Sequence, residues 1–261
     1  MRLHTETLPG ADPVLFLHGV TGSGRTYQWL ERAGAIRLDF RGHGESERTP
    51  GHYLIADYVA DAISVLESQD RPATLVGHSL GGVVAWTVAQ QRPDLVTRAF
   101  LEDPPLYQGE PEEHARNQAI PIFAETKLAL ERWLRDGTDE AAVKARLAAM
   151  PYLSGKAGEM LHDDALAARA YSLLHLDPEV IDRIVDGSLL AGTDTTSPVS
   201  VPVFVLASDP ELSAFPPEHE ARLAATHPDI EVVRLAGASH SIHDERAHRD
   251  EYARRLAAFL D

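Results

Sequence analysis

Short apolar runs alternate along the chain with longer stretches in which apolar residues recur every three or four positions. The short runs are rich in Val, Ile, Leu and Phe, as in strands that are buried on both faces of a sheet. They fall at residues 14–17, 35–38, 73–76, 97–101, 203–207 and 231–235, and one further strand fits around Leu3 to Leu8. Helical periodicity follows at about 55–68, 80–91, 217–226 and 246–260. We therefore predict an α/β fold, with a mostly parallel sheet flanked by helices.

The alternation stops between Asp103 and Val203. Only helical patterns occur in this stretch, and prolines and a glycine separate them. They lie at about 112–120, 125–136, 139–150, 163–175 and 178–186. We expect one α/β core, formed by residues 1–103 and 203–261, and an all-helical insertion of residues 104–202.

Residues Leu75 to Gly82 carry the strongest chemical signal. They read Leu-Val-Gly-His-Ser-Leu-Gly-Gly, which is a Gly-x-Ser-x-Gly motif between a predicted strand and a predicted helix. Gly77 and Gly81 lack the side chains that would collide in a sharp strand-to-helix turn. Such a turn exposes Ser79 at its tip as a nucleophile, and an ordinary strand-to-helix turn is the alternative interpretation.

A glycine-rich loop follows the first buried strand. It begins His18-Gly19-Val20 and contains two more glycines, so its backbone N–H groups can face a ligand without obstruction. We predict that the N–H of Val20 and the N–H of Leu80 form an oxyanion hole. Leu80 begins a helix, whose N-terminus adds positive potential. A plain glycine-rich turn is the alternative.

One histidine is well placed to act as a base. His240 lies on the loop just after the last predicted strand, and a neutral histidine can take a proton from a serine. It also follows Ser79 in chain order, as a serine, acid and histidine layout requires. Among the 13 histidines of the chain, His18, His78 and His243 are interpreted as turn residues or neighbours of the site.

Together these segments resemble the serine hydrolases of the α/β-hydrolase fold. The matching pieces are Leu17 to Gly19, Leu38 to Ser46, Gly77 to Gly82 and Gly237 to Ile242. The resemblance implies that the helical insertion forms a cap over the site. It also implies hydrolysis of a carboxylic ester or lactone of a small, fairly apolar molecule through an acyl-enzyme, as in carboxylesterases and lactonases (EC 3.1.1). The residues expected to contact substrate are His18, Gly19, His78, Tyr107 and Trp133.

The acid that orients the histidine has three candidates. The family commonly carries it after the strand that precedes His240, where this chain has Asp209 and Glu211. Some members carry it instead after the strand that follows the nucleophile helix, where this chain has Asp103. We favour Asp103, because its spacing from Ser79 resembles those members, and the other two remain open.

Other activities fit the same residues. Carbon–carbon bond hydrolysis and perhydrolase activity use the same three side chains, and small-molecule receptors with little turnover also exist within the fold. A receptor would hydrolyse its ligand only about once and would then associate with a partner. Substrate profiling and turnover measurements separate these alternatives.

Composition limits the possible partners, cofactors and location of the protein. A length of 261 residues with 44% hydrophobic residues suits one substantial core, and the net charge of −16 disfavours nucleic acids and anionic membranes as partners. The absence of cysteine excludes disulfides and thiolate ligands, and we expect neither a metal nor a cofactor. The first residues lack the basic and apolar regions of a secretory signal, so we expect a cytoplasmic location. A homodimer remains open.

Overall fold

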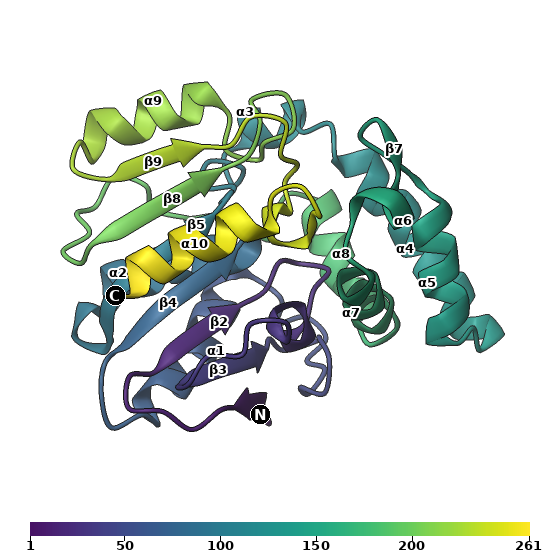
Figure 1. Cartoon of the computed structure of the whole chain (residues 1–261), viewed down its shortest axis with the longest axis horizontal. Helices are drawn as coiled ribbons and strands as arrows, with labels where there is room; N and C mark the ends of the chain where they lie inside the picture. The colour runs from purple at the N-terminus through teal and green to yellow at the C-terminus, as the bar shows by residue number, and fades with distance from the viewer.

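A seven-stranded sheet forms the centre of the molecule, and the computed structural model describes all residues 1–261 (Figure 1). In spatial order the strands are β1 (His4–Thr7), β3 (Ala35–Asp39), β2 (Val14–Leu17), β4 (Ala73–His78), β5 (Val96–Glu102), β8 (Val203–Ala207) and β9 (Glu231–Arg234). β1 pairs antiparallel with β3, and all other neighbouring strands of this sheet are parallel. The predicted mostly parallel α/β sheet is therefore confirmed.

Both faces of the sheet are buried under helices. Successive side chains of a strand point to opposite faces, so Leu15 and Leu17 of β2 join one hydrophobic core, whereas Val14 and Phe16 join another. The first core is covered by α1 (Ile55–Glu67), α2 (Leu80–Gln91) and α9 (Pro217–Thr226), and the second by α10 (Arg249–Leu260) and the short 3₁₀ turn Gly24–Tyr27. Water is excluded from both faces, which is why the strands appear in the sequence as unbroken apolar runs.

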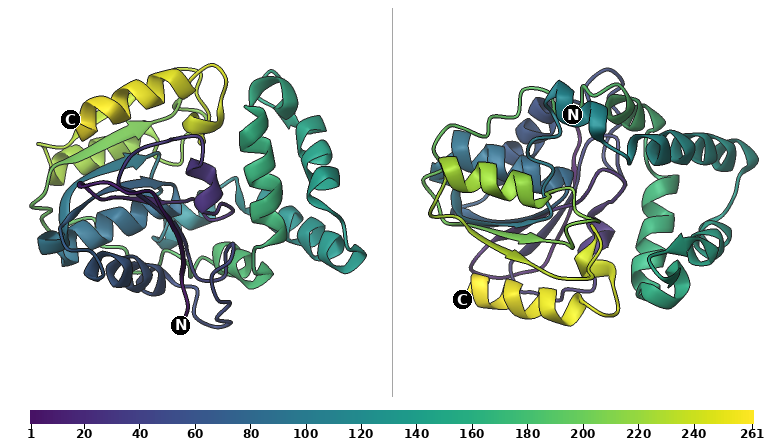
Figure 2. Two further views of the ribbon diagram at one scale, coloured as in Figure 1. Left: turned by 60° about the horizontal axis from the view of Figure 1, so that its bottom comes forward. Right: turned by 90° about the horizontal axis from the view of Figure 1, so that it is seen from above.

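The insertion between β5 and β8 forms a separate layer beyond the carboxyl ends of the parallel strands (Figures 1 and 2). Its helices are α3 (Pro111–Arg116), α4 (Ile120–Asp136), α5 (Glu140–Ala149), α6 (Ala157–Met160), α7 (Asp163–Leu174) and α8 (Pro178–Val185). α4 packs on α8, and α5 packs on α7. The core helices α2 and α9 have the bounds expected from the sequence.

Several details of the insertion differ from the sequence prediction. It is not all-helical, because β6 (Pro151–Tyr152) and β7 (Gly155–Lys156) form a small antiparallel hairpin. Also, α4 begins at Ile120 rather than near residue 125. The sequence pattern treats the prolines as separators between helices, but Pro121 lies in the first turn of α4, where a missing N–H costs nothing.

The insertion is bound to the loop that carries His240. An isolated antiparallel bridge joins Leu161 to Glu245, and the N–H of His162 donates to the carbonyl of Asp244 at 2.9 Å. The guanidinium of Arg169 donates to the Asp244 carboxylate at 2.8 Å. These contacts fix one side of the insertion against the core. No helix of the chain combines the length and the apolar character needed to cross a lipid bilayer.

Candidate active site

Ser79 lies at the sharp turn between β4 and α2. Its backbone has φ 53° and ψ −118°, a conformation that residues other than glycine rarely adopt and that costs about 1–3 kcal/mol. The two flanking glycines make this turn possible. A Cβ on Gly77 would lie 2.2 Å from the carbonyl oxygen of Gly81, and a Cβ on Gly81 would lie 2.0 Å from that of Leu17. This sharp turn therefore places Ser79 at the surface of a cavity, as the motif predicts.

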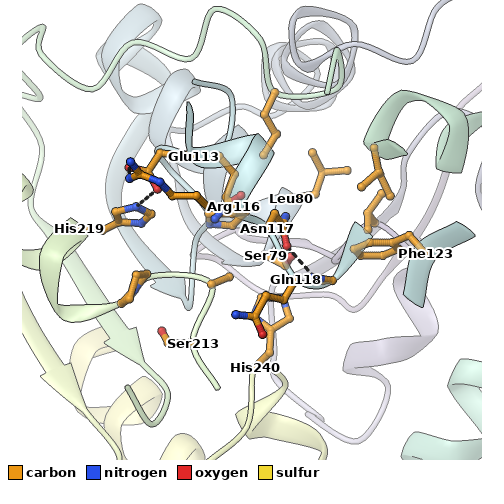
Figure 3. Close-up of a pocket in the computed structure, with 18 of the residues that line it drawn as sticks. Ser79, Leu80, Glu113, Arg116, Asn117, Gln118, Phe123, Ser213, His219 and His240 are labelled. Carbon is orange, nitrogen blue, oxygen red and sulfur yellow. Dashed lines mark hydrogen bonds and ion pairs between the residues drawn. The ribbon is translucent and has the colours of Figure 1, made fainter. Parts of the chain in front are cut away.

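The cavity has a volume of about 680 Å³, and Ser79, Leu80, Val20 and His240 all line it (Figure 3). The N–H of Val20 makes no hydrogen bond within the protein. Leu80 is the first residue of α2, and a first-turn N–H has no partner inside its own helix. Two backbone donors are thus available beside Ser79.

His240 and Asp103 form a close pair. The Nδ1–H of His240 donates to Oδ2 of Asp103 at 2.6 Å, within the distance expected for an acid that orients a catalytic histidine. Asp103 is fully buried directly after β5, with a positive φ of 44°. The His240 side chain is 35% exposed, so one edge of its ring remains accessible from the cavity.

Further donors surround the Asp103 carboxylate. The N–H of Ser208 and the hydroxyl of Ser213 donate to Oδ1, at 3.1 and 2.5 Å, and the N–H of Ala214 donates to Oδ2 at 2.8 Å. Burial alone would raise the pKa of Asp103, but the hydrogen bonds and the charge of His240 outweigh burial and lower the pKa. Asp103 is therefore an anion at neutral pH.

The other two candidate acids do not contact His240. The Asp209 carboxylate accepts the N–H of Gly237 at 2.8 Å and that of Glu211 at 3.2 Å, and these bonds lower its pKa. Asp209 thus caps the start of the loop that carries His240. Glu211 is exposed at the rim of the cavity and makes no ion pair. Among the three acids, the structure brings only Asp103 to the histidine.

A second buried pair lies next to the first. Oε2 of Glu102 accepts the Nδ1–H of His243 at 2.6 Å, and Oε1 accepts the backbone N–H of the same residue at 3.1 Å. Burial would lower the pKa of His243, but the charges of Glu102 and Asp244 outweigh it and raise the pKa. The ring of His78 lies between the two pairs, 4.8 Å from His240 and 4.9 Å from His243 between centroids.

The predicted substrate contacts of three residues near Ser79 are corrected, because His18, Gly19 and His78 do not line the cavity. The Nδ1–H of His18 donates to the carbonyl of Gly19 at 2.7 Å, and burial lowers its pKa to about 3. A Cβ on Gly19 would lie 2.7 Å from Nδ1 of His78. His78 donates from Nε2 to the carbonyl of His240 at 3.0 Å, and its pKa is lowered well below the usual value by burial. These three residues therefore support the residues that line the cavity without lining it themselves.

Two predicted contacts from the insertion are also wrong. Trp133 does not line the cavity, because it packs inside the insertion against Val143 and Leu173. Tyr107 is buried beneath the guanidinium of Arg222, which lies 3.9 Å from the centre of its ring. Apolar spacing along a helix cannot distinguish residues that pack between helices from residues that face a ligand.

The cavity wall includes residues that sequence reasoning missed. Its apolar members from the insertion are Ile122, Phe123, Ile184, Leu189 and Leu190. Three polar members, Glu113, Arg116 and His219, gather on the side of Ser79 away from Phe123 (Figure 3). Nε2 of His219 lies 3.2 Å from the Glu113 carboxylate. No motif marks these residues, since they meet only through the fold.

The sheet, the sharp turn at Ser79 and the buried carboxylate–histidine pair define the architecture of an α/β-type hydrolase. The model of the family described as "Alpha/beta hydrolase family" matches residues 14–255, and the chain belongs to that family. It is 36% identical over 103 residues to an uncharacterized protein of Mycobacterium tuberculosis (strain ATCC 25618 / H37Rv), covering 36% of this chain and 30% of that protein.

Two further similarities extend over most of the chain. The sn-1-specific diacylglycerol lipase ABHD11 of Mus musculus is 26% identical over 262 residues, covering 92% of this chain and 78% of that protein. The crystal structure of the enol-lactonase from Burkholderia xenovorans LB400 superposes with a TM-score of 0.71 at 20% identity, covering 99% and 96% of the two chains. That structural likeness confirms the fold.

Proposed function

We propose that this protein is a serine hydrolase that cleaves a carboxylic ester or lactone through an acyl-enzyme on Ser79. The observation that carries the proposal is the pair of Asp103 and His240, joined at 2.6 Å, on the same cavity as the strained turn of Ser79. The family membership and the names of the lipase and lactonase relatives support this class of reaction.

In the first half-reaction, Ser79 Oγ attacks the carbonyl carbon and its proton passes to Nε2 of His240. The carboxylate of Asp103 stabilises the resulting imidazolium. The N–H groups of Val20 and Leu80 hold the oxyanion, and each such donor contributes roughly 10²- to 10³-fold to kcat. His240 then protonates the leaving alcohol. In this structure no hydrogen bond joins Ser79 to His240, so the two side chains must approach each other before the proton is transferred.

In the second half-reaction, water replaces the alcohol. His240 takes a proton from the water, the hydroxide attacks the acyl carbon, and the proton returns to Ser79 as the acid product forms. In a lactone the alcohol and the acid belong to one molecule, so the product is a single hydroxy acid. The same residues perform both half-reactions.

The cavity refines the expected substrate. An interior of about 680 Å³ accepts a small molecule, within the usual range for ligand pockets. Because apolar residues and the polar group of Glu113, Arg116 and His219 both line the cavity, we propose an ester with one apolar side and one hydrogen-bonding side. This extends the expectation of a small, fairly apolar substrate.

Labelling with a fluorophosphonate, followed by a screen of p-nitrophenyl esters and simple lactones, tests the proposal. The label should lie on the peptide that contains Ser79, and Ser79→Ala should lose both labelling and turnover while keeping its circular dichroism spectrum. Ser213→Ala tests the position of the label, because Ser213 lines the same cavity: the label should stay on Ser79, although loss of the hydrogen bond from Ser213 to Asp103 should slow the reaction. Full esterase activity in purified Ser79→Ala, or stoichiometric hydrolysis without turnover in the wild type, would contradict the proposal.

A further inference from the structure

The loop that carries His240 is held by carboxylates from three places in the fold. We call residues 235–248, between β9 and α10, the histidine loop. Its N–H groups donate to Asp209 from Gly237 at 2.8 Å, to Glu245 from Ser239 at 3.1 Å, and to Glu102 from His243 at 3.1 Å. Asp209 is partly exposed and Glu245 belongs to the loop itself. Glu102 is the one anchor that comes from the buried centre of the sheet.

Glu102 binds both the backbone and the side chain of His243. The two contacts, at 3.1 and 2.6 Å, use both carboxylate oxygens, and both side chains are at most 1% exposed. Removing two charged groups from water costs free energy. Apolar residues of similar volume in place of a buried ion pair often leave the stability of a protein unchanged or increase it. Buried ion pairs that fix a geometry are retained in some proteins. Stability alone is therefore a weak explanation for this pair.

The position of the pair of Glu102 and His243 indicates a role in the reaction rather than in stability. Glu102 immediately precedes Asp103 at the end of β5, and His243 follows His240 by three residues on the histidine loop. One strand end therefore supplies both carboxylates, and one loop supplies both imidazoles. A shift of the loop relative to β5 would disturb both contacts together. His78 lies between the two imidazole rings and donates to the carbonyl of His240.

We propose that Glu102 and His243 are positioning residues for the reaction, an inference that rests on the proposed function. Glu102 holds His243, and His243 fixes the histidine loop so that the ring of His240 contacts Asp103 on one side and faces the cavity that Ser79 lines on the other. Misplacement of a catalytic group by about 1 Å can lower the rate roughly 10²-fold. The pair touches neither the cavity nor the substrate, so its removal should act on kcat and leave KM nearly unchanged.

Three variants test this: Glu102→Gln, His243→Gln and the double variant. Each single change should lower kcat about 10- to 100-fold with KM within about threefold. The rate of fluorophosphonate labelling of Ser79 should fall by a similar factor, because labelling also needs His240 in place. The double variant should be at most about threefold slower than the slower single variant, since both act through one contact.

Asp61→Asn is a closely matched control. Asp61 is a fully buried carboxylate that accepts the N–H of Arg41 at 3.2 Å and its guanidinium at 2.5 Å, and neither residue lines the cavity. This variant should lose thermal stability, with Tm lower by about 10 °C, and should keep kcat within about threefold. It separates loss of a buried ion pair from loss of loop position.

The outcomes are distinct. If folded Glu102→Gln loses stability like Asp61→Asn but keeps wild-type kcat and labelling rate, the pair is only structural and the inference is overturned. If Glu102→Gln does not fold, Glu102→Asp replaces it, because it keeps the charge and shortens the reach; wild-type kcat in that variant and in His243→Gln also overturns the inference. Absence of labelling and hydrolysis in the wild type would instead defeat the proposed function.

Discussion

Replacement of Asp103 by asparagine tests the assignment of the acid most directly. The change keeps the shape of the side chain but removes its charge and converts one acceptor oxygen into a donor. Asp103 accepts four hydrogen bonds, two of them from backbone N–H groups on opposite oxygens. In either orientation the new amide NH₂ must therefore face the N–H of Ser208 or the N–H of Ala214.

The structure allows the effect on stability to be separated from the effect on catalysis. A buried donor without an acceptor costs about 1–3 kcal/mol, which a domain with about 5–15 kcal/mol of stability can tolerate. Loss of the charge that orients and stabilises the histidine lowers kcat by roughly 10⁴ in comparable sites, or about 5.5 kcal/mol of barrier. A fall of that size in a folded variant therefore reports catalysis rather than unfolding.

The assay is steady-state hydrolysis of the best ester from the screen, with Tm measured on the same samples. Asp209→Asn is the control, because the Asp209 carboxylate does not contact His240 and accepts hydrogen bonds only from the N–H groups of Gly237 and Glu211. Its kcat should change by less than about tenfold. Near-normal kcat in Asp103→Asn together with a large loss in Asp209→Asn would refute the assignment.

Three further predictions concern pH, backbone packing and substrate binding. The pKa of His243 is raised in the folded protein, so its protonation stabilises the fold fully below about pH 6.5, and this stabilisation is lost as the pH rises through the raised pKa. The Tm of the wild type should therefore fall between pH 6 and pH 9. An equal fall in His243→Gln would contradict this prediction. Gly81→Ala should block folding or lower Tm by at least about 10 °C because of the 2.0 Å approach of its Cβ to a carbonyl, whereas Gly192→Ala, with open space around it, should lower Tm by only a few degrees. Phe123→Ala should raise KM for esters with an apolar side more than about tenfold with little change in kcat, and a change confined to kcat would count against the apolar wall.

The fold was largely predictable because its signals are local. The central strands are buried on both faces, so runs such as Val14–Leu17 and Val203–Ala207 stand out as uninterrupted apolar segments with the observed bounds. The hairpin of β6 and β7 was missed because two-residue strands leave no periodic pattern. The start of α4 was missed because a proline is compatible with both a helix end and a first turn.

The site was predictable only in part. Ser79 and His240 lie within recognisable local patterns, and the Asp103 contact with His240 agrees with the spacing that favoured it. Glu102, Ser213 and His219 could not be found, because their partners are more than 100 residues away in the sequence and no motif surrounds them. Chain order alone also could not exclude Asp209, whose real partner is a backbone N–H.

The bridge between Leu161 and Glu245 has a consequence for how new specificities can be built on this scaffold. Exchanging the insertion for that of another protein would remove Leu161, His162 and Arg169, which hold Glu245 and Asp244 in the histidine loop. Recombination points placed only at the ends of the insertion therefore separate two segments that depend on each other. A chimaera that also transfers residues 244–246 preserves their mutual fit, and it leaves His240 and the pair of Glu102 and His243 in place while the insertion is varied.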